Sequence, residues 1–320
     1  MEQITIQTDF AKDVLEGLSA NPKHLSSKYF YDDTGSKIFQ DIMRMPEYYL
    51  TDCELEIFET QSDEILNAFT EDGSEFEIIE LGAGDGVKTK VLLSHFLNKN
   101  CICEYVPIDI SEDAVSNLVI DMELQLPGLN IKGKVGDYFK LIDEINTAEK
   151  RKKVLLFLGS NIGNFNELES LDFLSKLKDV MHPGDLLFIG FDLKKDPEII
   201  LNAYNDPHGH TAAFNLNLLD RINNKLNADF VLQNFRHREI YDPETGTAKS
   251  ELISITKQKV EIQDLGKAFW FEEGEAIFME MSQKYDLNMI TGLAKKSGFQ
   301  VVRNFYDKRL YFMNSLWKLK

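Results

Sequence analysis

The sequence has few cysteines and no long apolar run. Its three cysteines, Cys53, Cys101 and Cys103, are too few for the disulfide framework of a secreted scaffold and predict reduced thiols in a cytoplasmic protein. Cys101 and Cys103 lack a second ligand pair, so we expect no metal site. No apolar run approaches the roughly 20 residues that span a bilayer, and residues 1–10 lack the basic and apolar parts of a secretory signal. No membrane partner is therefore expected.

Positive charge is also scarce. Lys and Arg number 35 against 53 Asp and Glu, which gives a formal net charge of −18. Such a surface keeps a protein soluble and repels nucleic-acid phosphates and anionic lipid, so nucleic acid is not an expected partner. With 43% hydrophobic and 28% charged residues among 320, the chain has the composition of one large globular domain or two closely joined ones.

Strand and helix patterns alternate in the middle of the chain. Nearly all-apolar runs such as residues 153–159 are typical of the centre of a parallel sheet. Helices with one apolar face separate these runs. Strands are predicted over 76–81, 101–110, 129–135, 153–159 and 185–193, and helices over 87–97, after Ser111 and over 168–181. The alternation predicts a doubly wound, Rossmann-like α/β sheet.

The flanking segments have other patterns. A helix is predicted over residues 9–20, followed by an irregular aromatic stretch. Thr51-Asp52-Cys53-Glu54 has the pattern of a capping box that begins the next helix. Residues 194–285 mix helical and alternating segments, which predicts an inserted α+β region. A helix over 286–297 and an antiparallel hairpin complete the chain.

A glycine-rich turn follows the first strand of the sheet, Glu80-Leu81-Gly82-Ala83-Gly84-Asp85-Gly86. Glycines at alternate positions let the backbone approach a ligand and turn N–H groups toward it. The pattern E-x-G-x-G-x-G resembles motif I of the class I S-adenosylmethionine-dependent methyltransferases. A dehydrogenase would have G-x-G-x-x-G, with the third glycine displaced by one position. We therefore favour a methyltransferase cofactor site.

Polar residues that suit the parts of this cofactor follow along the chain. Asp109 can accept hydrogen bonds from a ribose, or it can simply begin the turn before Ser111. Asp137 offers an acceptor for the amino group of an adenine, and Tyr138 an adjacent aromatic ring. Lys88 can pair with the carboxylate of the methionine part. The expected cofactor-binding residues are Gly82, Gly84, Gly86, Lys88, Asp109, Asp137 and Tyr138.

Five segments carry a more specific resemblance. They are KYFYDDTGSKIF (28–39), MPEYYLT (45–51), FLGSNIGNF (157–165), TAAFNLNLL (211–219) and EAIFMEMSQKY (275–285). In this order they resemble the histidine-specific N-alpha-methyltransferases of ergothioneine biosynthesis, from about residue 20 to the C-terminus. The resemblance implies that three S-adenosylmethionine molecules convert L-histidine to its betaine, hercynine. No iron-dependent sulfur-transfer domain is expected within this length.

The resemblance also implies a domain organisation. A Rossmann-like class I methyltransferase sheet would be joined to a second, smaller α+β substrate domain. The S-adenosylmethionine-binding domain would comprise residues 53–193 plus 286–320, and the substrate-binding domain residues 1–52 plus 194–285.

Substrate residues are implied by the same resemblance. Methyl transfer needs an unprotonated amine in line with the methyl group, and the amide carbonyl of Asn164 can accept from the amine without ionising. Glu280 and Ser282 are two residues apart, so both side chains share one face of a strand. The expected residues are Tyr48, Asn164 and Tyr204 for the amino acid, Glu280 and Ser282 for the imidazole, and Tyr31 with Asn164 for catalysis.

Alternatives stay open at this stage. Tyr31 and Tyr48 can be core aromatics, and Asn164 can be a turn residue. The enzyme can act on another amino acid or amine, or the chain can bind the cofactor without turnover. Ser250 departs from the family, which usually has a methionine near the substrate ring in the segment matching TAKSELIS. A roomier or more polar pocket would follow, so the exact substrate stays open.

Overall fold

The structure is a computed structural model that describes residues 8–148 and 151–320. It divides into two compact units, one of Met1–Tyr49 with Lys195–Ser282 and one of Leu50–Lys194 with Gln283–Lys320. We call the first the insertion unit and the second the sheet unit. The predicted domain boundaries lie within three residues of this division, and residues 1–7 of the predicted substrate domain lie outside the described residues.

The sheet unit contains a seven-stranded sheet of order β12-β13-β6-β5-β2-β3-β4. Strands β2 to β6 pair in parallel, whereas β13 pairs antiparallel with both β6 and β12. The strands are β2 (Phe76–Leu81), β3 (Ile102–Asp109), β4 (Lys134–Val135), β5 (Lys152–Phe157), β6 (Leu186–Asp192), β12 (Phe299–Tyr306) and β13 (Phe312–Leu319). The order reverses between β2 and β5, and ligands of α/β sheets bind outside the carboxyl ends of the strands at such a point.

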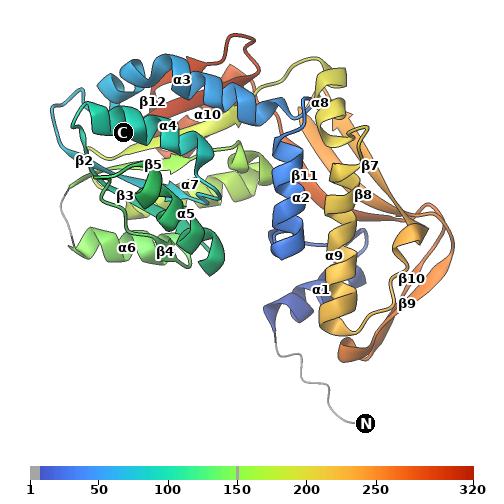
Figure 1. Ribbon diagram of the computed structural model, residues 1–320. Coiled ribbons are helices and arrows are strands. Elements are labelled where there is room, and N and C mark those ends of the chain that lie inside the picture. Colours follow the sequence, from blue (N-terminus) through green and yellow to red (C-terminus); the bar gives the residue numbers. More distant parts are fainter. Residues whose placement is uncertain (1–7, 149–150) are drawn as a thin grey trace. The chain divides into compact units, whose positions relative to one another are not determined.

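The predicted doubly wound sheet and its C-terminal hairpin are therefore confirmed. The helices around the sheet are α3 (Tyr49–Phe69), α4 (Val87–Asn98), α5 (Glu112–Gln125), α6 (Tyr138–Ala148), α7 (Glu167–Val180) and α10 (Leu287–Ser297) (Figure 1). Phe76 and Ile79 lie three residues apart on β2 and so face opposite sides. Phe76 packs against Phe69 of α3, while Ile79 belongs to the core formed with α6, α7 and α10.

Two sequence predictions about the N-terminal third are wrong. Helix α3 begins at Tyr49, before Thr51, and Glu54 bonds Lys88 instead of closing a capping box. The stretch predicted as irregular contains helix α2 (Asp33–Met43). Gly35 weakens the helical pattern in the sequence, but a Cβ there would lie 1.8 Å from the backbone oxygen of Phe30, so close packing explains the glycine.

The insertion unit contains a four-stranded sheet of order β1-β11-β8-β7 and a separate β9–β10 hairpin. Its strands are β1 (Lys23–His24), β7 (Phe235–Asp242), β8 (Thr247–Ser254), β9 (Gln258–Ile262), β10 (Lys267–Phe271) and β11 (Ala276–Gln283). Its helices are α1 (Asp9–Ser19), α2, α8 (Pro197–Tyr204) and α9 (His210–Leu226). Helix α1 confirms the predicted first helix, and Thr8 caps it by accepting from the Ala11 N–H at 3.2 Å.

Helix α9 organises the core of this unit. Phe214 and Leu218 of α9 pack in one cluster with Leu252 of β8 and Met279 of β11. Helix α2 lies beside α9 (Figure 1), and the Asn217 side-chain amide donates to Asp32, the cap of α2, at 2.9 Å. The α+β character predicted for the insertion is confirmed.

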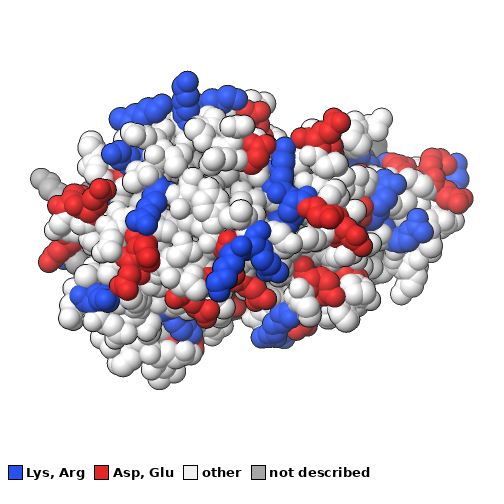
Figure 2. Space-filling view, turned by 90° about the horizontal axis from the view of Figure 1, so that it is seen from above, with Lys and Arg blue, Asp and Glu red and all other residues white. Residues whose placement is uncertain are grey.

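The excess of acidic residues is not gathered in one place on the face drawn in Figure 2. There acidic and basic side chains lie interspersed. Within residues 8–148 and 151–320, none of the helices has the length and apolar character required to cross a bilayer.

Candidate cofactor and amino-acid sites

The glycine turn joins β2 to α4 at the point where the strand order reverses. Gly82, Gly84 and Gly86 have φ angles of 70°, 55° and 64°, which L side chains rarely adopt. A Cβ on Gly86 would lie 2.4 Å from Leu118 of α5, so this glycine allows α4 and α5 to pack closely. Gly84 faces open space, with no atom within 4 Å of the position a Cβ would take. The turn therefore presents backbone on an open side, as ligand binding requires.

Three other predicted cofactor residues lie beside this turn. A Cβ on Gly82 would lie 3.1 Å from the Tyr138 hydroxyl. Burial, together with the negative charges of Asp109 and Asp137, raises the pKa of Tyr138 to about 12, so the phenol stays neutral. The fold thus brings together Gly82, Asp109, Asp137 and Tyr138, although they lie at the ends of three different strands, β2, β3 and β4. Carboxylates, a hydroxyl and exposed backbone fit the sugar and base of a nucleoside.

The two carboxylates also have local roles. Asp109 accepts from the Ser111 N–H at 3.0 Å, and Asp137 accepts from the N–H groups of Phe139 and Lys140 at 3.1 and 3.2 Å. The simple turn role considered for Asp109 is thus present, and one oxygen of each group serves it. Ile110, directly after Asp109, is 84% exposed.

Lys88 is held by Glu54, which the sequence pattern predicted to be part of a helix capping box. Its ammonium forms an ion pair with the buried carboxylate of Glu54. Glu54 also accepts from the Gly159 N–H at 2.9 Å and from the Asn314 side-chain amide at 2.8 Å. The expected contact of Lys88 with the methionine carboxylate stays a prediction.

Glu80, the first residue of the glycine motif, is buried behind the turn. Its carboxylate accepts from the Thr89 hydroxyl at 2.7 Å and from the Tyr105 hydroxyl. Burial raises the pKa of Glu80 to about 7, and the two hydrogen bonds oppose that shift. Glu80 thereby ties β2, β3 and α4 together beneath the turn.

Asn164 ends a short 3₁₀ helix, η2 (Asn161–Asn164), that follows β5. The segment begins at Ser160, whose φ of 59° is unusual for a residue other than glycine. The Ser160 hydroxyl holds the segment by accepting from the Asp192 N–H at 2.9 Å. Gly163 allows close contact with Gln283, because a Cβ would lie 2.8 Å from the Gln283 backbone oxygen. Asn164 itself is exposed.

A row of contacts joins four of the predicted substrate residues of the insertion unit, Tyr31, Tyr48, Tyr204 and Ser282. Tyr31 packs edge-to-face on Phe39 at 5.4 Å between ring centroids, and Phe39 packs on Tyr48 at 6.3 Å. Tyr48 packs on Tyr204 at 6.1 Å, and the Tyr204 hydroxyl lies 3.2 Å from that of Ser282. The role of Tyr31 and Tyr48 as packed aromatics is thus real, yet Tyr31 stays 48% exposed.

Strand β11 has the alternation predicted for it. Ile277 and Met279 are buried in the core of the insertion unit, while Phe278, Glu280 and Ser282 are only partly buried. Glu280 and Ser282 therefore share a face opposite to Met279. Asn164 and the cofactor residues belong to the sheet unit, whereas Tyr31, Tyr48, Tyr204, Glu280 and Ser282 belong to the insertion unit.

His237 of β7 supports Tyr204 and was missed by sequence reasoning. Its Nε2 lies 2.9 Å from the Tyr204 backbone oxygen, and its Nδ1 lies 3.4 Å from the Asn215 side-chain amide nitrogen. Burial lowers the pKa of His237 despite the opposing contact with Tyr204. A neutral ring that donates through Nε2 satisfies both neighbours. The packing of α8 against β7 joins segments that are far apart in the chain, so no local pattern in the sequence indicated it.

Ser250 lies on β8 directly opposite Glu239 of β7. Its hydroxyl donates to the Glu239 carboxylate at 2.5 Å, and the serine is buried. The departure noted in the sequence therefore places a polar pair on this sheet.

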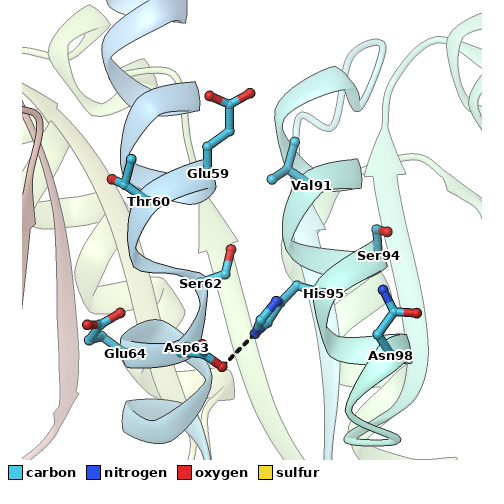
Figure 3. A pocket seen from close by; sticks show the side chains of 9 residues that line it. All are labelled: Glu59, Thr60, Ser62, Asp63, Glu64, Val91, Ser94, His95 and Asn98. Atoms are coloured by element: carbon cyan, nitrogen blue, oxygen red, sulfur yellow. Dashed lines mark hydrogen bonds and ion pairs between the residues drawn. The ribbon is translucent and has the colours of Figure 1, made fainter.

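A groove between α3 and α4 is separate from these residues. Figure 3 shows Asp63 reaching across it to His95, with 3.0 Å between the bonded atoms. The groove is lined by Glu59, Thr60, Ser62, Asp63, Glu64, Val91, Ser94, His95 and Asn98, none of which the sequence analysis assigned to a site. In the described part of the chain, no group of three or more His, Cys, Asp or Glu side chains is placed to hold a metal ion.

Comparison with known proteins finds a match along nearly the whole chain. The profile of a family described as "Histidine-specific methyltransferase, SAM-dependent" matches residues 10–319. A "Histidine N-alpha-methyltransferase" of Mycobacterium tuberculosis is 34% identical over 297 residues, covering 93% of this chain and 91% of that protein. A protein of the same name in Mycolicibacterium smegmatis is 35% identical over 285 residues, covering 89% and 87%. "Ergothioneine biosynthesis protein 1" of Schizosaccharomyces pombe is 27% identical over 287 residues, covering 88% of this chain and 37% of that protein.

Proposed function

The chain belongs to the histidine-specific, S-adenosylmethionine-dependent methyltransferases, and from this membership we propose that it methylates the α-amino group of L-histidine to give hercynine. The observation that carries the proposal is the family match over residues 10–319, together with 34% and 35% identity to two proteins named for this activity. The resemblance seen in the sequence is thereby confirmed at the level of the family.

In this proposal the glycine turn and its neighbours hold the cofactor. Asp109 receives the ribose hydroxyls, Asp137 and Tyr138 receive the adenine, and Lys88 pairs with the methionine carboxylate. The bound cofactor supplies a methyl group activated on a sulfonium centre, so the chain has to provide orientation and a neutral amine, with no metal ion. The open side of Gly84 supports this placement.

The residues that the family resemblance assigns to the substrate position the amino acid. Glu280 accepts the imidazole N–H, and Ser282 serves the second ring nitrogen because a hydroxyl can donate or accept. Tyr48 and Tyr204 hold the amino-acid end. Asn164 and Tyr31 orient the amine toward the methyl group, and a proton must leave the amine before each transfer. The contact between Tyr204 and Ser282 supports a common role for the two residues.

The cellular setting is part of the proposal. The partner is a free amino acid, and we place the reaction in the cytoplasm. In the described part of the chain, Cys53 and Cys101 are unpaired thiols.

A second candidate keeps the reaction and changes the amino acid. The polar Ser250–Glu239 pair stands where the resemblance leads us to expect a methionine, so the pocket can favour a more polar amine than histidine. This candidate needs the same cofactor residues and the same Asn164.

One experiment decides between the two candidates. The full chain is incubated with S-adenosylmethionine and each of the twenty amino acids, and the products are measured by mass spectrometry. We expect histidine to gain one, two and then three methyl groups. A different amino acid methylated faster than histidine would support the second candidate, and no methylated product from any of them would contradict both.

A further inference from the structure

We propose that Glu54 is a positioning residue of the cofactor site, which holds Lys88 and the turn after β5 in the geometry that receives the methionine end of S-adenosylmethionine. The inference rests on the proposed function, because it assumes that this cofactor binds beside Lys88. Glu54 comes from α3 and is separated from Lys88 by 34 residues.

Glu54 is buried and surrounded by hydrogen-bond donors. Its side chain has no solvent exposure, and among the described residues Lys88, Gly159 and Asn314 donate hydrogen bonds to it. One oxygen receives the Lys88 ammonium and the Gly159 N–H at 2.9 Å, and the other receives the Asn314 amide at 2.8 Å. A buried carboxylate is tolerated when it is fully hydrogen-bonded and paired with a cation. Glu54 meets both conditions.

These partners meet at the functional edge of the sheet. A Cβ on Gly159 would lie 3.5 Å from the Lys88 ammonium, so the lysine tip lies at the carboxyl end of β5. Strand β5 is the neighbour of β2 at which the strand order reverses, and ligands of α/β sheets bind at that point. Glu54 thus holds the Lys88 ammonium at the position where a ligand is expected.

Positioning by Glu54 has a physical consequence for binding. A lysine side chain has many rotamers, and ordering it on binding reduces affinity. The ion pair with Glu54 orders Lys88 beforehand, and an ammonium has three donors, so the pair leaves capacity for a second carboxylate. Loss of the Glu54 charge should therefore weaken contacts with the methionine carboxylate while contacts with the adenosine part persist.

The chain offers a matched control on the same two helices. Asp63 and His95 form a second contact between α3 and α4 (Figure 3), but Asp63 is exposed at the surface. Asp63→Asn therefore changes an α3–α4 contact without touching Lys88.

Calorimetry on the full chain tests the inference with two probes. S-adenosylhomocysteine carries the amino-acid end, and 5′-methylthioadenosine lacks it. Glu54→Gln removes the charge, and Glu54→Asp keeps it but withdraws it by one methylene from Lys88, so both should weaken S-adenosylhomocysteine binding by roughly tenfold or more, with 5′-methylthioadenosine affinity unchanged. Lys88→Met should give the same pattern, and adding Glu54→Gln to it should cause little further loss. Asp63→Asn should alter neither affinity.

The outcomes separate the inference from the proposed function. Equal losses for both probes in the Glu54 variants would mean a purely structural role and would overturn the inference. Loss of S-adenosylhomocysteine affinity in Lys88→Met alone, with Glu54→Gln and Glu54→Asp unchanged, would overturn the inference and leave the cofactor site intact. Unchanged affinity in Lys88→Met would overturn the Lys88 assignment and the inference together. If Glu54→Gln does not fold, Glu54→Asp carries the test.

Discussion

The hydroxyl of Tyr204, at the end of α8, lies 3.2 Å from the hydroxyl of Ser282 on β11, although 78 residues separate them in the chain. Ser282 shares its strand face with Glu280, so the contact brings a tyrosine of α8 to the face that we assign to the imidazole. The position of Tyr204 depends in turn on the backbone contact with His237.

His237→Leu should therefore impair amino-acid binding without affecting the cofactor. The variant removes the hydrogen bond that the His237 ring donates to the Tyr204 carbonyl, and the loss of such a bond costs about 0.5–1.5 kcal/mol. We expect the KM for histidine to rise by up to roughly tenfold, and S-adenosylhomocysteine affinity to stay constant. Steady-state kinetics and calorimetry measure the two quantities.

Two variants control this experiment. His237→Gln keeps a donor near the Tyr204 oxygen and should restore part of the KM, whereas the exposed His208→Ala should behave like the wild type. A KM unchanged in His237→Leu would contradict the support of Tyr204 by His237.

Asp109→Ala should weaken S-adenosylmethionine binding. In the proposed site its carboxylate accepts from the ribose hydroxyls, and hydrogen bonds to charged groups contribute about 1.5–3 kcal/mol. The affinity measured by calorimetry should fall by roughly tenfold or more. Because Asp109 also accepts from the Ser111 N–H, thermal unfolding must be compared, and Asp109→Asn keeps that acceptor. Unchanged cofactor affinity in both variants would remove Asp109 from the site.

Glu80→Gln should make the protein more stable at alkaline pH. The folded-state pKa of Glu80, about 7, lies above its ordinary value of 4.5. A group with a raised pKa stabilises the fold fully below its unfolded pKa, and this contribution is lost as the pH rises through 7. Between pH 5 and pH 8.5, the free energy of unfolding of the wild type should fall by up to about 3 kcal/mol relative to that of the variant.

Thermal unfolding at several pH values measures this difference. The exposed Glu59→Gln provides the control, and it should show the same pH dependence as the wild type. If the difference in stability between Glu80→Gln and the wild type does not increase with pH, the result would contradict a buried carboxylate that titrates near neutrality.

Local patterns predicted the sheet well where both faces of a strand are covered. All six residues of β2 are buried, and its predicted bounds agree with the structure. The predicted strand over 129–135 is reduced to Lys134–Val135, which pair with the end of β3, and to a single bridge between Ile131 and Tyr105 of β3. Alternation of apolar residues indicates burial, but it does not indicate which residues at the edge of a sheet pair with the neighbouring strand.

Long-range pairing explains what the sequence could not predict in the sites. Thr51 and Glu54 have the spacing of a capping box, but the deciding partner of Glu54 is Lys88, which no local pattern indicates. Glu280 and Ser282 could be placed on one strand face from their spacing alone. The support of Tyr204 by His237 depends on how α8 packs against β7, which only the fold provides.

Specificity gives the last prediction, and it concerns Glu280. In the proposed site the Glu280 carboxylate accepts the imidazole N–H, and its loss leaves a substrate donor unpaired. Losing such a hydrogen bond costs about 1.5–3 kcal/mol, or roughly one to two orders of magnitude in kcat/KM. Glu280→Ala should therefore lower kcat/KM for histidine strongly and leave S-adenosylmethionine affinity intact. Tryptophan, phenylalanine and leucine should become relatively better substrates, because they no longer have to desolvate a carboxylate. Asn164→Ala should instead lower methylation of every substrate, since it acts on the amine that they share. The deciding quantity is the ratio of kcat/KM for histidine to that for tryptophan in the wild type and both variants. A ratio unchanged by Glu280→Ala would mean that Glu280 does not recognise the imidazole, and a ratio changed by Asn164→Ala would mean that Asn164 acts on more than the amine.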